Sequence, residues 1–329
     1  MALKIAVLDD YADVARQYAD WPQGDDVTVF HRTMTDPAEL AATLAPFDVL
    51  CVMRERTPLD GALIRALPNL KLIVTTGARN LSIDVAAAQE RGITVCGTQS
   101  RGTTTAEFVM ALMLALTRRI VPEANSAAAG GWQTGMGRDL SGLTLGIAGF
   151  GRIGRQVATL ARPFGVEILA WSRSLTADRA AADGVRHAPD LDALLQGSDI
   201  VSINLVLSDT TRGLFGAREL ALMRPDALLL NTSRGPIVQV DPLLAALRAG
   251  RLGGAALDVH DVEPLPYGAP VLDRDLIDSG RLLVTPHLGY VSDQTFRMFY
   301  RQTVEAVEAW KAGRPIRVIG GGPQATPST

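Results

Sequence analysis

Three polar side chains in the second half of the chain have the types needed to reduce a carbonyl. Arg234 lies in "NTSRG", Glu263 in "DVHDVEP" and His287 in "TPHLG", and each motif opens where a short apolar run ends. A guanidinium can hold a carboxylate through two parallel hydrogen bonds and polarise the adjacent carbonyl. A histidine can give a proton to the carbonyl oxygen as hydride arrives at carbon, and a neighbouring glutamate stabilises the imidazolium. We therefore predict these three residues as the catalytic group.

A glycine-rich turn provides a candidate cofactor site. "TLGIAGFGRIGRQVATLARPFG" contains Gly149, Gly151 and Gly154 in the spacing G-x-G-x-x-G, between a strand-like run and a helix-like segment. Such a turn lets the backbone approach a pyrophosphate, and the helix that follows offers free N–H groups and the positive end of its dipole. We predict a dinucleotide site here, with Arg152 and Ile153 among its contacts.

The stretch "AWSRS" lies where a carboxylate usually holds the ribose of NAD, about 20 residues beyond the glycine motif. Ser172 takes that place, 18 residues after Gly154, and Asp178 comes too late and is expected to begin the next helix. Ser172 does not repel a 2′-phosphate, and Arg173 can pair with one. These residues favour NADP(H) over NAD(H). The alternative is that Arg173 is solvated or stacks on adenine.

The elements that carry these motifs form two alternating series. Residues 3–96 and the segment from Leu143 onward each alternate short runs rich in Val, Ile and Leu with helix-like segments. Strands of this kind are buried on both faces of a parallel sheet, with helices covering both sides. We predict an α/β protein with two doubly wound parallel-sheet domains. A buried helix from "TTTAEFVMALMLALTRRI" is expected to join them.

In the order of these motifs, the chain resembles the D-isomer-specific 2-hydroxyacid dehydrogenases over nearly its whole length. The resemblance implies a Rossmann dinucleotide-binding domain at residues 102–292. It implies a discontinuous, flavodoxin-like substrate domain made of residues 1–101 and 293–329. The implied activity is hydride transfer between NAD(P)H and a small 2-oxo acid, giving a D-2-hydroxy acid, with His287 as the acid/base. The same family contains corepressors, so a dinucleotide-sensing interaction protein is the alternative.

The resemblance also implies further contacts. Asp258 matches the position that contacts the nicotinamide carboxamide, and Thr105 matches a position near the nicotinamide. Thr232 is also predicted to contact the cofactor. Gly77 and Ala78, in "TTGARN", match the loop whose N–H groups meet the substrate carboxylate.

Two arginines of the first domain follow apolar runs. Arg54 and Arg79 could bind a second acidic group of the substrate, or they could be loop charges or interdomain ion-pair partners. We include Arg54 among the predicted substrate contacts.

The other histidines are expected to be structural. His260 stands where the family usually has Phe or Tyr, and a packing role is favoured for it. His31 and His187 lie in or beside strands and show no partner pattern. The sequence shows no metal-ligand cluster, so no metal is predicted.

Composition limits the partners. The 329 residues carry a net charge of only −3, which gives no reason to expect a nucleic-acid partner. Cys51 and Cys96 end apolar runs and are expected to be reduced core thiols. The N-terminus lacks the apolar stretch of a signal peptide and no run is long enough to span a bilayer, so we expect a cytoplasmic protein with no membrane partner. A homodimer through the cofactor domain is also expected.

Overall fold

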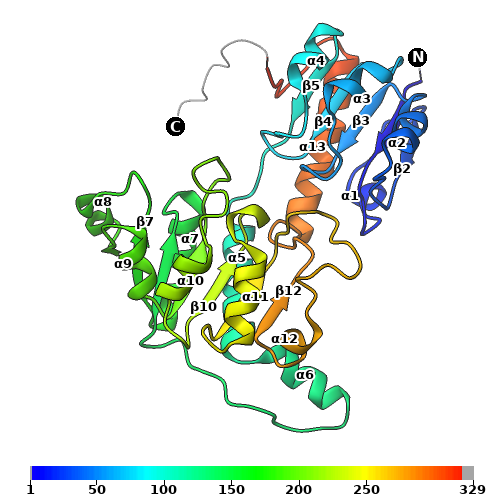
Figure 1. The fold of residues 1–329 in the computed structure, drawn as a ribbon. Coiled ribbons are helices and arrows are strands. Elements are labelled where there is room, and N and C mark those ends of the chain that lie inside the picture. The colour runs from blue at the N-terminus through cyan, green and yellow to red at the C-terminus, as the bar shows by residue number, and fades with distance from the viewer. Residues whose placement is uncertain (1, 321–329) are drawn as a thin grey trace. The chain divides into compact units, whose positions relative to one another are not determined.

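The computed structural model describes residues 2–320, and the chain divides into two compact units. Unit 1 is formed by the residues up to Arg101 together with those from Ser292 onward, and unit 2 is Gly102–Val291. Each unit is built on its own parallel sheet (Figure 1).

The sheet of unit 1 has five parallel strands in the order β2-β1-β3-β4-β5. This is the strand order of flavodoxin-like folds, as predicted. The order reverses between β1 and β3, so the loops that follow these two strands lie at the topological switch point. The strands are β1 (Lys4–Val7), β2 (Asp26–Val29), β3 (Val49–Val52), β4 (Leu72–Thr75) and β5 (Thr94–Gly97).

Helices cover both faces of this sheet. One core packs strand residues such as Leu50 and Ile73 against α2 (Pro37–Leu44), α3 (Gly61–Ala66) and α4 (Val85–Glu90). The opposite face is covered by α13 (Asp293–Lys311), which contacts β4, β5 and α1 (Ala15–Tyr18). The buried stripe of α13 has helical spacing and includes Phe296, Phe299, Tyr300, Val304 and Val307.

The sheet of unit 2 has seven parallel strands in the order β12-β11-β10-β9-β6-β7-β8. The direction of winding reverses between β6 and β9, as in a Rossmann sheet. The strands are β6 (Thr144–Ala148), β7 (Glu167–Trp171), β8 (Arg186–His187), β9 (Ile200–Ile203), β10 (Leu228–Asn231), β11 (Gly254–Leu257) and β12 (Leu282–Val284).

Alternate residues of these strands enter two cores, one on each face. Leu228 and Leu230 point to the core formed with α5 (Thr103–Thr117) and α7 (Arg152–Ala161), whereas Leu229 points to the core on the other face. The doubly wound prediction is therefore confirmed for both units. The remaining helices are α8 (Ala177–Ala182), α9 (Leu191–Gln196), α10 (Ala217–Leu222), α11 (Val240–Arg248), α12 (Arg274–Asp278) and the 3₁₀ turns η1 (Arg162–Phe164) and η2 (Gly235–Ile237).

The predicted helix at "TTTAEFVMALMLALTRRI" is in fact interrupted. α5 ends at Thr117, Arg119 takes a left-handed φ of 54°, and α6 (Ile120–Ala128) begins directly after it. α5 is buried along much of its length, but no residue of α6 is buried. Figure 1 shows α6 and the segment after it extending from the rest of unit 2. We call residues 120–137 the α6 arm.

Two further predictions from the sequence concern the state of the cysteines and membrane-spanning segments. Cys51 and Cys96 are both free and buried, as expected, and burial raises the pKa of the Cys96 thiol to about 11. Within residues 2–320, no helix combines the length and apolar character that crossing a membrane requires.

Candidate active site

Three adjacent strands bring the predicted catalytic residues to one edge of unit 2. β10, β11 and β12 are neighbours and run parallel, so their carboxyl ends meet at the same edge. Arg234 follows β10, Glu263 lies in the loop after β11, and His287 follows β12. In open parallel sheets, ligands bind outside this edge.

Glu263 and His287 form a hydrogen-bonded pair. His287 Nδ1 lies 2.6 Å from Glu263 Oε2, and both side chains are 18% exposed. The other oxygen of Glu263 accepts the backbone N–H of His260 at 2.8 Å. The carboxylate is thereby held from two directions and orients the imidazole, so that Nε2 is the ring nitrogen left for proton transfer. The rings of Tyr290 and His287 pack in a T-shaped arrangement, with the centroids 5.3 Å apart.

The loop that carries Arg234 is shaped by Asn231. Its side-chain amide donates to the carbonyl of Arg234 at 3.0 Å and accepts from the N–H of Ser233 at 3.1 Å. A Cβ at Gly235 would collide with the backbone of His260. Glycine therefore lets the arginine loop pack directly on the loop that leads to Glu263.

Asp258 anchors the loop that carries His287. The residue is fully buried; Oδ1 accepts the Thr285 hydroxyl and the Leu288 N–H, each at 2.6 Å, and Oδ2 accepts the Gly289 N–H at 2.8 Å. Burial raises the pKa of Asp258, and these hydrogen bonds oppose the rise. His287, between two of the tied residues, has a left-handed φ of 56°.

Asp258 and Thr105, the two residues expected near the nicotinamide, both lie against the loop that carries His287. Asp258 directs both of its oxygens to the His287 loop, as described above. Thr105 lies beside the same loop, because its Cγ2 is 3.6 Å from where a Cβ on Gly289 would be.

The glycine-rich turn connects β6 to α7, and each glycine has a steric reason. Gly149 has a φ of +100° and a Cβ on it would collide with the backbone of Asn204, in the loop after β9. A Cβ on Gly154 would collide with the carbonyl of Gly149, so this glycine allows close packing of helix and strand. Only Gly151 faces open space, with nothing within 4 Å of such a Cβ.

The open space at Gly151 would allow a phosphate group to approach the backbone closely. It lies at the N-terminus of α7, whose N-cap makes no side-chain hydrogen bond, so the first N–H groups of the helix point toward a ligand site. The turn also lies at the switch point between β6 and β9. Arg152 and Ile153 begin α7, and the Arg152 guanidinium lies against Gly102.

The residues directly after β7, 172–174, carry two hydroxyls and a guanidinium. Ser172 is half-buried, whereas Arg173 is exposed and donates to the Thr210 hydroxyl at 3.0 Å. Asp178 lies in the first turn of α8, as expected, and not at the strand end. Thr232 is buried directly after β10.

The substrate residues predicted in unit 1 form a local assembly of their own. Gly77 has a φ of +95°, and a Cβ on it would collide with the Arg54 guanidinium, which therefore lies over the glycine. Arg54 itself has a φ of 50°, and its N–H donates to the Thr76 hydroxyl at 2.9 Å. The Gly77 N–H donates to the Thr98 hydroxyl at 2.7 Å, so that N–H is already paired within the unit. Ala78 and Arg79 are exposed.

Sequence reasoning missed several residues that shape these loops. Asn231 and Thr285 organise the loops of Arg234 and His287, yet their roles depend on partners that no local pattern reveals. His260, expected to be a packing residue, also places a ring nitrogen 3.0 Å from the Thr285 carbonyl. His187 has a structural contact, with Nε2 3.0 Å from the Leu175 carbonyl. His31 lies close to two aspartates, Asp10 and Asp13.

Unit 2 combines a Rossmann sheet, a glycine-rich turn at its switch point and an Arg, Glu and His group at the same sheet edge. This combination is typical of a dinucleotide-binding oxidoreductase. Residues 110–289 match the sequence model of the "D-isomer specific 2-hydroxyacid dehydrogenase, NAD binding domain". The chain belongs to this family, as the resemblance predicted.

Relatives match most of the chain. It is 35% identical to the glycerate dehydrogenase of Methylorubrum extorquens over 86% of this chain and 88% of that protein. It is 35% identical to a glyoxylate reductase of Korarchaeum cryptofilum, over 78% of this chain and 77% of the relative. The crystal structure of a phosphoglycerate oxidoreductase from Vibrio cholerae O395 is similar, with a TM-score of 0.87 and 36% identity, covering 94% of this chain and 99% of that one.

Proposed function

We propose that this protein is an NAD(P)-dependent reductase of small 2-oxo acids that forms D-2-hydroxy acids. The observation that carries the proposal is the Glu263–His287 pair, 2.6 Å apart, on the same sheet edge as Arg234 and the glycine-rich turn. The names of the relatives support it, because glycerate dehydrogenase and glyoxylate reductase both act on small 2-hydroxy or 2-oxo acids.

The three residues have separate roles in this proposal. Bound NAD(P)H supplies the hydride. Arg234 holds the substrate carboxylate and polarises the 2-oxo group, because a guanidinium presents two parallel N–H donors. His287 Nε2 donates a proton to the oxygen as the carbonyl is reduced, and Glu263 stabilises the imidazolium before that transfer. Asp258 and Asn231 hold the loops on which these side chains lie.

Unit 1 would contribute contacts to the rest of the substrate. We propose that the Ala78 N–H meets the carboxylate and that the Gly77 N–H joins it if the bond to Thr98 is released. Arg54 is proposed to bind a second acidic group of the substrate. Arg79 is exposed, and nothing in the local structure assigns it a ligand.

A substrate panel tests the assignment. Glyoxylate, hydroxypyruvate and larger 2-oxo acids are each offered with NADH and NADPH, and the configuration of the product is determined. We expect turnover of at least one small 2-oxo acid to its D-hydroxy acid. A protein that binds the dinucleotide but reduces none of them would instead favour the dinucleotide-sensing alternative.

We also propose that the cofactor is NADP(H) in preference to NAD(H). Ser172 and the exposed Arg173 follow β7, at the position where NAD-binding sites usually have a carboxylate that holds the ribose. Such a carboxylate would repel a 2′-phosphate, whereas serine and arginine do not. An exposed arginine–phosphate contact is screened by salt, so the preference is expected to be moderate and to weaken as salt rises.

The ratio of kcat/KM for NADPH to that for NADH measures this preference. Ser172→Asp combined with Arg173→Ala should reverse the order, whereas Arg186→Ala, which removes an exposed arginine on β8, should leave it unchanged. A wild type that favours NADH by tenfold, about 1.4 kcal/mol, contradicts the proposal.

A homodimer through unit 2 is the third part of the proposal. The α6 arm exposes Trp132 by 80% and Met136 by 91%, yet it is internally tied, because Glu123 accepts both the N–H and the hydroxyl of Thr134. An isolated helix of nine residues is not stable in water without packing. We propose that a second copy covers the arm.

Trp132→Arg with Met136→Lys should yield monomers in sedimentation experiments; dimers of unchanged affinity would contradict this.

A further inference from the structure

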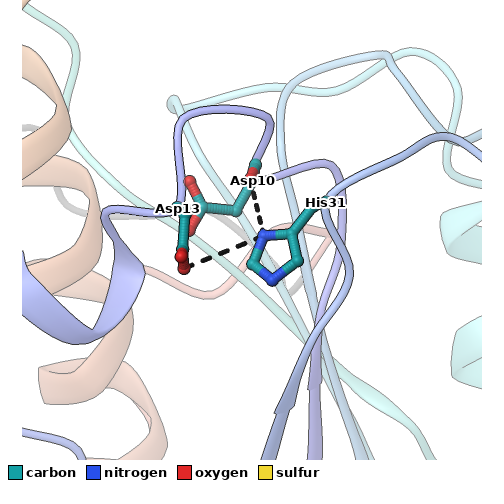
Figure 2. Close-up of side chains that lie close together, drawn as sticks. All are labelled: Asp10, Asp13 and His31. Atoms are coloured by element: carbon teal, nitrogen blue, oxygen red, sulfur yellow. Dashed lines mark hydrogen bonds and ion pairs between the residues drawn. The ribbon is translucent and has the colours of Figure 1, made fainter.

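Asp10, Asp13 and His31 form a cluster at the carboxyl edge of the unit 1 sheet (Figure 2). β1 pairs in parallel with β2, and Val7 is the partner of Val29. The residues that follow β1 and β2 therefore lie close together at the carboxyl edge of the sheet. One candidate ligand atom from each of the three side chains lies within 4.8 Å of the others.

The cluster combines one buried and two exposed side chains. Asp10 is fully buried, whereas the side chains of His31 and Asp13 are 51% and 75% exposed. His31 Nδ1 lies 3.8 Å from Asp13 Oδ1 and 3.1 Å from the carbonyl oxygen of Asp10. In Figure 2 the imidazole edge that bears Nδ1 is turned toward both aspartates. The cluster therefore extends from two solvent-exposed side chains to one buried carboxylate.

The Asp10 carboxylate is only half satisfied within residues 2–320. Oδ2 accepts the N–H groups of Val14 and Ala15 at 2.9 and 2.8 Å. Oδ1 is buried and has no hydrogen-bond partner. Leaving a buried polar oxygen without a partner is destabilising, because the oxygen has lost its hydration and gained no hydrogen bond in return. A cation bound by Oδ1 together with His31 and Asp13 would give this oxygen a partner.

We propose that Asp10, Asp13 and His31 bind a divalent transition-metal ion, for which Zn²⁺ is the appropriate probe. Two carboxylates and one imidazole suit Zn²⁺ better than Mg²⁺ or Ca²⁺, because those harder ions prefer oxygen alone. Ligand bonds of about 2.0–2.2 Å place two ligand atoms at most about 4.4 Å apart, so the 3.8 Å between His31 and Asp13 already fits.

The rest of the coordination needs only small changes. His31 and Asp13 are exposed and can move onto the ion, whereas Asp10 is held by its bonds to Val14 and Ala15. When Nδ1 becomes a ligand, its contact with the Asp10 carbonyl is given up and the imidazole proton lies on Nε2. Water fills the remaining positions. The ion joins the loop after β1 to the loop after β2, and the proposed hydride chemistry does not depend on it.

Direct binding tests the site. The untagged full-length chain is stripped with a chelator, dialysed, and titrated with Zn²⁺, Mn²⁺ and Mg²⁺ by calorimetry and equilibrium dialysis. We expect one Zn²⁺ site per chain, weaker Mn²⁺ binding in line with the general affinity order, and no Mg²⁺ binding. His31→Ala and Asp13→Asn should each weaken Zn²⁺ binding at least tenfold.

Matched controls separate this site from adventitious binding. Asp20→Asn and His187→Ala remove an exposed aspartate of unit 1 and the histidine of β8, and both should bind Zn²⁺ as the wild type does. Zn²⁺ should also slow amide exchange in residues 10–15 and 30–32 of the wild type and not of His31→Ala. The proposal is overturned if the wild type shows no saturable binding up to about 1 mM, corresponding to about 4 kcal/mol. It is also overturned if both cluster variants bind Zn²⁺ as the wild type does.

Discussion

The two sheets end in similar edges that are organised by different buried aspartates. In unit 2, Asp258 follows β11 and collects three hydrogen bonds from one loop, the one that carries His287. In unit 1, Asp9 follows β1 and accepts the hydroxyls of Thr33 and Thr57, which belong to two different loops. Burial raises the pKa of both carboxyls.

The difference between Asp258 and Asp9 shows that the loops at a sheet edge need buried anchors before their side chains can form a binding or catalytic site. Strand order brings side chains to one edge but leaves their loops without a defined conformation. Asp258 sets the conformation of a single loop beside the Glu263–His287 pair. Asp9 instead ties together the loop after β2 and the loop after β3, and Arg54 lies on the second of these loops. We therefore expect changes in unit 2 to affect turnover and changes in unit 1 to affect substrate affinity or stability.

The largest effect is expected from His287→Ala. The variant should lose about 10²–10⁴-fold in kcat and keep its dinucleotide affinity, because positioned proton transfer contributes that much. Steady-state kinetics and fluorescence titration of the cofactor measure the two quantities. His187→Ala is the matched control, and near-normal turnover of a folded His287→Ala protein would refute the assignment.

Asp258→Asn should lower kcat by roughly tenfold. Its amide keeps one acceptor oxygen, but the NH₂ group that replaces the other oxygen cannot accept an N–H, and a lost buried bond costs about 1–3 kcal/mol. The loop of His287 should shift, while the KM for the 2-oxo acid changes little. If kcat is retained and only thermal stability falls, Asp258 does not position the acid/base.

Gly77→Ala tests the corresponding edge of unit 1. The new Cβ would displace the Arg54 guanidinium, and we expect the KM for the 2-oxo acid to rise several-fold with little change in kcat. Gly92→Ala is a matched control, because Gly92 also has a positive φ but has open space around it. Both variants carry the backbone penalty of about 1–2 kcal/mol, so equal KM values would contradict a role for the Arg54 loop in substrate binding.

The smallest effect concerns the pH dependence of stability. The pKa of Asp9 is raised in the folded state mainly by burial, so the unfolded chain ionises first as pH rises above 3.8. The wild type should lose stability relative to Asp9→Asn as pH rises through the raised pKa, and the difference should then become constant. Urea unfolding at several pH values measures it. A difference that does not vary with pH would show that Asp9 ionises equally in both states.

Much of the fold and part of the site could be predicted from local pattern. Short apolar runs mark nearly all the strands, because residues of a doubly covered parallel strand are apolar on both faces. The glycine spacing locates the turn after β6, since its steric demands lie within a few residues and between neighbouring strand ends. The break between α5 and α6 was missed, because nothing in "LTRRIV" requires Arg119 to adopt a left-handed conformation.

The sequence by itself determined the element types, the glycine turn and the candidate residues Arg234, Glu263 and His287, because these follow from local spacing. Only the tertiary structure decided which groups meet. Asp258 bonds residues about 30 positions away, and His31, interpreted from sequence as an isolated structural histidine, lies against Asp10 because of the β1–β2 register. Such pairings depend on which strands are neighbours and on their register. Both are set by burial of the whole sheet, and no short segment contains that information.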